Sequence, residues 1–505
     1  MKNPDIIINN YEKTLPTKSK WESLYRPVFE YMMPGRLPNG DKKQTEIFAS
    51  LGEQCSDKFV QKLQNILTPV GSDWIELEAG YSLSKTADDL SEINRNLNAV
   101  AEICNVYKNV SNFDCACSEF YYDLIAGTAC LLISEGTCEK PLRFSVIPIN
   151  QFSFAEGAFG EINEVYRKIT IKKELIPVSW RDSSYTVPSD SADKEVELLE
   201  ATYFDYEKNI WFYHIINLEN KKNIVERSYK TNPFVILRWT KYAGEIYGRG
   251  PGMKVINDLK TLNKINEYSL RALAFTIPVF CASQESDYDV DDFVFEPGAI
   301  NPVPSTLTNN PTITQLGVNQ SPDLQAYNIE RLEMEIKKNM FDVTIPNDPD
   351  RDMTATEISQ RANELNDSLN TNFGRLVNEF LYPLTRRIIE ILQRFGYLSD
   401  NIDIAQFNGF GYKIKINTDL GNQAKEKQVQ RILNAVQTLL SLDSTQTLAP
   451  KVINFTALAP YMMQQMGVPE NFINSEEEIQ QLQMNEALAG AILQQQKQTA
   501  EVKNA

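Results

Sequence analysis

The sequence predicts an α+β fold that is mainly α-helical. Apolar residues recur at helical spacing up to about residue 128 and again after Gly252, whereas residues 129–242 carry short segments rich in β-branched and aromatic residues. The chain has 505 residues, of which 42% are hydrophobic and 23% are charged. This composition is typical of a globular protein of roughly three or four structural units.

The N-terminal part is expected to be helical. Trp21, Leu24, Tyr25 and Val28 follow a helical period, a second stripe ends before Pro69 and Gly71, and a third runs over 88–110. From about residue 129 to 242 the pattern changes, and polar turns separate short apolar segments such as 144–147, 164–171 and 211–216. These segments predict short antiparallel strands in a small barrel or sandwich.

Two helices that flank a Pro-rich insert are expected next. The first begins at Gly252 and places Val255, Leu259, Leu262 and Leu273 on one face until Pro278 interrupts it. Residues 278–321 are rich in Pro, Gly, Asn and Ser and predict a compact unit of strands and loops. The second helix covers about 323–341, and the segment 344–352 cannot be helical through its two prolines.

The strongest helical pattern follows this segment. Thr354 and Glu357 fit a capping box, and apolar residues then advance by three or four as far as Ile388. The pattern predicts one helix of about forty residues that Gly374 and Pro383 bend. Residues 421–505 are Gln-rich and predict further, interrupted helices.

The charge of the chain limits its function. With 50 Lys and Arg against 67 Asp and Glu, the net charge is −17, and the isoelectric point is near 4.8. A protein that holds DNA over its whole surface needs a basic excess, so tight binding of this kind is excluded, whereas loose local contact is not. The spacing of the seven cysteines matches no metal-ligand pattern. The longest uncharged apolar stretch, 272–284, is too short for a membrane span. We therefore expect a protein of the cytoplasm with reduced thiols and no membrane contact.

No catalytic constellation is evident, and we expect neither an enzyme nor a cofactor or metal. The only histidine, His214, lies in an aromatic strand, and the phosphate-binding motif of ATP-driven motors is missing. The Gly-rich stretch 248–252 contains Pro251, which favours a turn into a helix over a nucleotide loop. Residues 287–292 resemble the start of a calcium loop but lack its Gly and its Glu. A metal-dependent nuclease or other DNA-processing enzyme that uses the carboxylates near 287–296 remains the alternative.

Several blocks in a fixed order carry a resemblance to a known family. They are Ile66–Trp74; Pro233–Trp239 with Gly244–Pro251; Met353–Ile358 with Gly374–Leu376 and Glu379–Leu384; and Gly467–Glu470 with Ser475–Glu478. Read together, these blocks resemble the portal, or head-to-tail connector, proteins of short-tailed bacteriophages. The turn Asn417–Asn422 departs from the family pattern, and so does the shortage of apolar residues in the Gln-rich tail.

The resemblance implies a ring of about twelve subunits at one capsid vertex. It implies a conduit for the packaging and ejection of double-stranded DNA that docks first the terminase large subunit and then tail adaptor proteins, beside the major capsid and scaffolding proteins, in a virion assembled in the host cytoplasm. A different structural ring, such as a tail adaptor, is a further alternative, but those chains are usually shorter.

The resemblance also implies a division of the chain. The parts are a helical wing part (1–128), a β-rich wing subdomain (129–245), stem helix 1 (246–277), a clip (278–321), stem helix 2 (322–341), a channel loop (342–353), a long wing helix and strand (354–420), and a helical crown with the C-terminal tail (421–505).

Two groups of candidate site residues follow from this division. The channel loop is expected to face DNA without reading bases, through Asp342, Val343, Thr344, Ile345, Asn347 and Arg351. The first stem helix is expected to contribute a subunit interface or channel wall through Lys254, Leu259, Lys260, Leu262, Lys264 and Arg271. Alternatively, the stem cations pair with Glu330, Glu333 or Glu335 of the facing helix, and the loop is a solvent-exposed linker.

Overall fold

The computed structural model divides the chain into two compact units, residues 1–416 and 417–505. The structure describes residues 2–34, 46–80, 87–177, 180, 195–274, 279–284, 294, 299–304, 313–316, 322–342, 374–399, 403–404, 407, 411–416, 429–438, 441, 458–459 and 462–463. In the second unit, residues 429–438 are helical, as expected for this part of the chain.

Four helices form most of the N-terminal part, as predicted. They are α1 (Pro4–Met32), α2 (Leu51–Leu67), α3 (Ala87–Val110) and α4 (Phe113–Ala126). The side chain of Asn3 caps α1 by accepting a hydrogen bond from the Asp5 N–H, and Pro4 occupies the first turn, where its missing N–H has no partner to lose. One strand interrupts the helices: β1 (Ile75–Ala79) pairs antiparallel with β13 (Tyr412–Ile416).

The strands between 128 and 238 form two open sheets. The five-stranded sheet is a meander of β4 (Phe152–Glu156), β5 (Ile162–Lys172), β6 (Glu195–Asp205), β7 (Ile210–Asn217) and β8 (Lys222–Tyr229), and a short 3₁₀ turn, η2 (Lys173–Leu175), follows β5. The three-stranded sheet has the order β3 (Leu142–Ile147), β2 (Thr128–Glu135), β9 (Phe234–Arg238). The expected antiparallel strands are confirmed. Of the two expected arrangements, a small barrel or a sandwich, the barrel is not formed by the described strands, which make two separate sheets in which β9 pairs with the distant β2.

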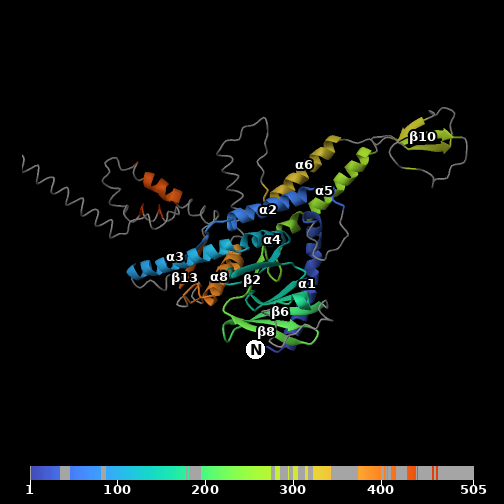
Figure 1. Cartoon of the computed structure of the whole chain (residues 1–505). Helices are drawn as coiled ribbons and strands as arrows, with labels where there is room; N and C mark the ends of the chain where they lie inside the picture. Colours follow the sequence, from blue (N-terminus) through green and yellow to red (C-terminus); the bar gives the residue numbers. More distant parts are fainter. Residues whose placement is uncertain are drawn as a thin grey trace, which may run out of the picture. The chain divides into compact units, whose positions relative to one another are not determined.

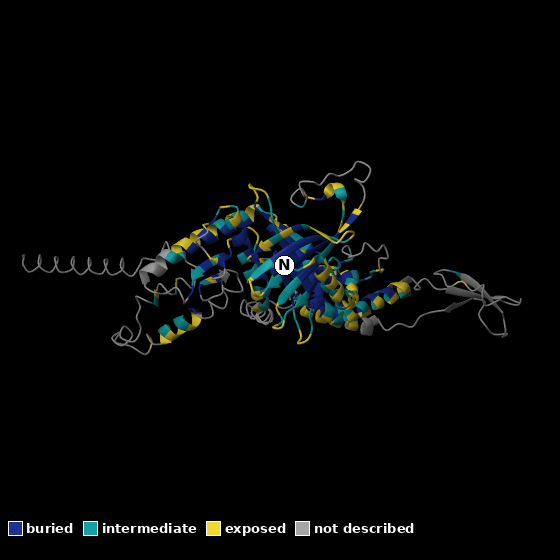
Figure 2. Cartoon of the chain, turned by 90° about the horizontal axis from the view of Figure 1, so that it is seen from below, coloured by how far each residue is buried: buried dark blue, intermediate teal, exposed yellow. Residues whose placement is uncertain are grey.

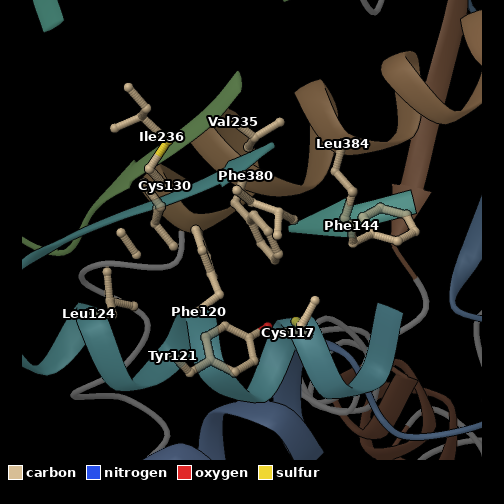
Figure 3. Close-up of a cluster of buried hydrophobic side chains, with 14 of the residues drawn as sticks. Cys117, Phe120, Tyr121, Leu124, Cys130, Phe144, Val235, Ile236, Phe380 and Leu384 are labelled. Carbon is tan, nitrogen blue, oxygen red and sulfur yellow. The ribbon is translucent and has the colours of Figure 1, made fainter. Parts of the chain in front are cut away.

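The core lies where α4 and the helical residues 376–394 meet the three-stranded sheet. Figure 3 shows Phe120 of α4 pointing toward Phe380, and the two rings stack with centroids 4.8 Å apart, while the Tyr121 ring lies 6.1 Å from that of Phe380. The six residues Thr128–Ile133 of β2 are all buried, as expected for a central strand covered on both faces. Figure 2 shows the buried residues gathered where helices cover the sheets, with exposed residues on the outward sides of the helices.

The predicted arrangement of helix, Pro-rich insert and helix is present. Helices α5 (Pro251–Ala274) and α6 (Pro322–Asn339) pack side by side (Figure 1). The insert contains β10 (Val279–Gln284), β11 (Ile300–Pro304) and β12 (Ile313–Leu316), with β10 parallel to β11 and antiparallel to β12. Over the described ranges, none of the helices is both long and apolar enough to cross a membrane.

The predicted bend at Pro383 has a structural counterpart. A π-helical stretch, η6 (Leu376–Leu381), runs directly into α8 (Tyr382–Arg394), and the Tyr382 N–H donates to the Val377 carbonyl. Proline has no N–H to give, which disturbs the α-helical ladder at this point and favours the wider turn. The first part of the predicted forty-residue helix, 354–373, lies outside the described residues.

Candidate functional site

The two apolar stem candidates belong to the core of their own subunit. Leu259 is 1% exposed and Leu262 is 0% exposed, and both lie in the main hydrophobic core. Leu259 packs into the space above Gly52 of α2, where an added Cβ would stand 2.7 Å from Leu259 Cδ2. The expectation that these leucines meet a neighbouring subunit or the channel is therefore wrong, because helix periodicity reveals a buried face but does not show which chain covers it.

The four cationic candidates lie on the outer side of α5. Lys254, Lys264 and Arg271 are exposed and Lys260 is partly exposed. Lys264 and Arg271 both pair with Glu267, at 2.8 and 2.6 Å, within the same helix. The hydrogen bond from Lys264 lowers the pKa of Glu267 and raises that of Lys264.

The alternative of ion pairs between the two stem helices does not describe these contacts. Glu333 pairs with Lys337 of its own helix, at 3.7 Å. Lys260 Nζ lies 5.8 Å from the centre of the Tyr31 ring, which belongs to α1. The outer side of α5 therefore keeps three exposed cations, two of which share one carboxylate.

Helix α6 ends in a turn with an unusual residue at its left-handed position. Phe341 has φ = 60°, its N–H donates to the Lys338 carbonyl, and the next N–H, of Asp342, donates to the Lys337 carbonyl. These bonds are those of a Schellman motif, in which glycine normally occupies the left-handed position. A bulky residue with positive φ costs about 1–2 kcal/mol, so the Phe341 ring must recover that cost through packing.

An aromatic cluster supplies this packing. The Phe341 ring lies 5.7 Å from the Trp239 ring and 6.1 Å from the Phe59 ring, and these two rings are 5.3 Å apart. Each such pair contributes about 0.5–1.5 kcal/mol beyond the burial of its surface. The cluster thereby offsets the strained backbone and fixes the direction in which the chain leaves α6.

Asp342, expected to face DNA, is instead part of this junction. Its carboxylate pairs with Lys58 of α2 at 3.0 Å, and its side chain is 7% exposed. A carboxylate that is buried and paired in this way cannot line an open channel, so this expectation is wrong. The other candidates of the loop, Val343, Thr344, Ile345, Asn347 and Arg351, lie outside the described residues.

A buried ion-pair network lies at the end of strand β9, around its last residue, Arg238. Arg238 donates two side-chain hydrogen bonds to the carboxylate of Glu379 in η6, from Nε at 3.1 Å and from Nη2 at 2.7 Å. Its backbone N–H donates to the same carboxylate. Arg238 Nη1 and Lys241 both bind Glu156 of β4, and Arg375 binds Glu379 at 3.0 Å. Burial lowers the pKa of Arg238, but the hydrogen bonds to Glu379 and the two carboxylates raise it above its usual value.

Comparison with known proteins decides the family. Residues 5–473 match the family of bacteriophage head to tail connecting proteins. The chain belongs to this family. This connecting protein is 20% identical to the probable portal protein of Bordetella phage BPP-1, over 75% of this chain and 72% of that protein. It is also 20% identical to the portal protein of Escherichia phage T7, over 76% of this chain and 73% of that protein.

A solved structure of the neck of an empty gene transfer agent particle is also similar to this connecting protein. The identity is 10%, and the match covers 81% of this chain and 89% of that chain with a TM-score of 0.35. A score of this size does not establish a common fold.

The Gly-rich stretch of the connecting protein leads into α5, as expected, and its glycines are also sites of close packing. A Cβ at Gly250 would fall on the Ile125 carbonyl, and one at Gly252 would stand 2.7 Å from Val28 Cγ1. The Gly250 N–H donates to the Ala126 carbonyl, which leads the chain directly into α5. These glycines therefore let three segments of backbone approach closely, and the N–H groups of Gly248 and Gly250 donate to Thr128 Oγ1 and to the Ala126 carbonyl.

His214 of the connecting protein is a buried strand residue. Its ring stacks on Tyr203 at 5.5 Å, its Nδ1 lies 3.2 Å from Asn223 Nδ2, and burial lowers its pKa. Among the residues that the structure describes, no three His, Cys, Asp or Glu side chains come together as a metal site. The acidic loop 287–292 lies outside the described residues.

Sequence reasoning missed the residues that organise the junction. Arg238, Trp239 and Glu379 lie within the family-like blocks but carry no signal of their own, and Phe59 is one residue of the helical stripe that ends before Pro69. The one available signal was Phe341, the last apolar residue before a segment with two prolines, because a helix that stops there needs a cap.

Proposed function

We propose that this connecting protein forms a ring of about twelve copies at one vertex of a phage capsid and acts as a portal. DNA would pass through the ring during packaging and again during ejection. The terminase large subunit would dock on it first, and tail adaptor proteins would replace the motor later, with major capsid and scaffolding proteins around it. The observation that carries the proposal is the family match over residues 5–473.

We propose the corresponding division of labour along the chain. Helices α5 and α6 would form the stem, because they pack side by side and enclose a small strand unit between them in sequence. The strands β10–β12 would form the clip, and the N-terminal helices with both larger sheets would form the wing. The segment that follows Asp342 would supply the channel loop through Val343, Thr344, Ile345, Asn347 and Arg351.

The charge of the chain supports a conduit that does not retain its DNA. About twelve copies of −17 give a ring of about −204, and an acidic wall repels the phosphate backbone. The exposed cations Lys254, Lys264 and Arg271 on α5 offer weak, local phosphate contacts. Such contacts carry no base recognition, as a genome of any sequence must slide past them.

Imaging of the purified protein tests the proposal. Negative-stain images should show rings of roughly 12-fold symmetry with a central hole. Monomers in solution would not contradict the ring, since assembly can depend on the capsid scaffold, but single copies extracted from mature virions would.

A deletion tests the channel loop separately. Removal of Ile345–Asp350 should leave ring assembly intact and reduce genome retention or the completion of packaging. Normal DNA content and infectivity of such virions would refute a channel role for this segment.

The proposed role is structural and not enzymatic. No observation on the described residues favours the nuclease alternative. The purified protein should not cleave plasmid DNA with Mg²⁺ or Mn²⁺; metal-dependent cleavage that disappears when Asp289→Ala and Asp291→Ala are combined would revive that alternative.

A further inference from the structure

Two neighbouring residues at the end of β9 hold the chain on both sides of the segment 343–373. The strand ends at Arg238, and Trp239 follows it. Successive side chains of a strand point to opposite faces, so Arg238 and Trp239 reach different elements from the same short piece of backbone. Trp239 contacts the end of α6, and Arg238 contacts η6.

The contact of Trp239 fixes the chain before the segment. Its ring is 1% exposed and meets both Phe59 and Phe341. Lys58 and Lys62 of α2 strengthen the same junction through the Asp342 carboxylate and the Phe341 carbonyl, at 3.0 and 3.5 Å. The last turn of α6 is therefore held by rings, by an ion pair and by its own capping bonds.

The contact of Arg238 fixes the chain after the segment. Glu379 lies close behind Gly374, the first described residue after the segment. Its carboxylate accepts three hydrogen bonds from Arg238 and one from Arg375. The side chain of Arg238 is 4% exposed, so water has little access to this ion pair. A bidentate Arg–carboxylate pair also fixes orientation, because both groups are planar.

We propose that Arg238 and Trp239 form one anchor that positions both ends of the segment 343–373. The role of the anchor rests on the proposed portal function, in which the first part of this segment, up to residue 353, supplies the channel loop. About twelve copies of the loop must then stand at the same radius and height. Two ends attached to adjacent residues, one at the end of the core strand β9 and one directly after it, meet this need.

Hydrogen–deuterium exchange of the full-length protein tests the anchor with three substitutions. Trp239→Leu should speed exchange in the last turn of α6, residues 336–342, roughly tenfold or more and leave residues 376–381 unchanged. Glu379→Gln should do the reverse. Trp239→Phe keeps an aromatic ring and should restore most of the protection in 336–342.

Glu390→Gln is the matched control. Glu390 is a buried carboxylate in α8, the helix into which η6 runs. It accepts hydrogen bonds from the N–H groups of Lys230 and Thr231 and reaches neither end of the segment. It should leave exchange in 336–342 and 376–381 as in the wild type. The anchor is overturned if Trp239→Leu and Glu379→Gln change neither region, or if the control changes both regions as much.

The DNA content of particles separates the anchor from the portal function. Particles assembled with Trp239→Leu or Glu379→Gln should contain rings and retain less DNA. If exchange changes as expected and DNA content stays normal, the anchor holds and the channel role of the segment fails. If exchange does not change, the anchor fails whatever the particles contain.

Discussion

Leu259→Ala should destabilise the folded subunit and leave the ring interface intact. Leu259 is 1% exposed and fills the space above Gly52, so its truncation removes buried methyl groups and leaves a cavity. Leucine-to-alanine changes at such sites cost roughly 3–5 kcal/mol. We expect about 3 kcal/mol, which corresponds to a roughly 150-fold shift of the folding equilibrium.

Urea unfolding followed by tryptophan fluorescence measures this loss as a lower midpoint at an unchanged slope. Leu270→Ala is the matched control, because Leu270 lies on the same helix and is 53% exposed; it should change the stability by less than about 1 kcal/mol. The subunits of Leu259→Ala that fold should still assemble. A variant of normal stability that cannot form rings would refute the core assignment and restore the interface that the sequence suggested.

A double-mutant cycle with Gly52→Ala sharpens the test. Alanine normally favours a helix over glycine by about 1 kcal/mol, but here its Cβ would stand 2.7 Å from both Leu259 Cδ2 and the Tyr31 carbonyl. Gly52→Ala should therefore destabilise the subunit. In the Leu259→Ala background one of the two clashes disappears, so the double variant should be about 1 kcal/mol more stable than the two single changes predict together. Simple additivity would show that the two residues do not touch.

Three further outcomes are expected. Gly250→Ala places a Cβ on the Ile125 carbonyl and should yield little soluble protein, as judged by expression and circular dichroism. Burial lowers the pKa of Lys108 to about 8, so this side chain binds a proton more tightly in the unfolded protein than in the folded one. Because buried thiols such as Cys104 have raised pKa values and oppose this effect, the comparison is between variants: the stability of the wild type relative to Lys108→Met should rise by about 2 kcal/mol between pH 7 and 10 in urea titrations. Asp342→Asn breaks the pair with Lys58, which is 44% exposed, and should cost only about 1 kcal/mol in the same assay.

The helices could be predicted from the sequence because their signal is local. The period of apolar residues gave α3, α5 and α6 to within a few residues, and the Pro-rich composition gave the strand unit between α5 and α6. The pairing of strands is not local. Nothing near Ile75 indicates that its partner is Ile416, and nothing near Thr128 indicates Arg238. The division into two sheets therefore became visible only in the structure.

The candidate site shows the same limit. The stripe on α5 correctly marked Leu259 and Leu262 as buried, but burial by the same chain and burial by a neighbouring copy give the same pattern. Asp342 counted as a loop carboxylate, and its partner Lys58 is 284 residues away. Arg238 and Glu379 carried no charge pattern that links them, because their elements meet only through the fold.

The mass of the protein released from mature virions tests the central claim most directly. About twelve copies of 57.6 kDa form a particle near 691 kDa. Native mass measurement of gently disrupted particles should give one assembly of about this mass, and images of the same sample should show a ring with an open centre. Single subunits of 57.6 kDa as the only form in that sample would contradict the portal assignment.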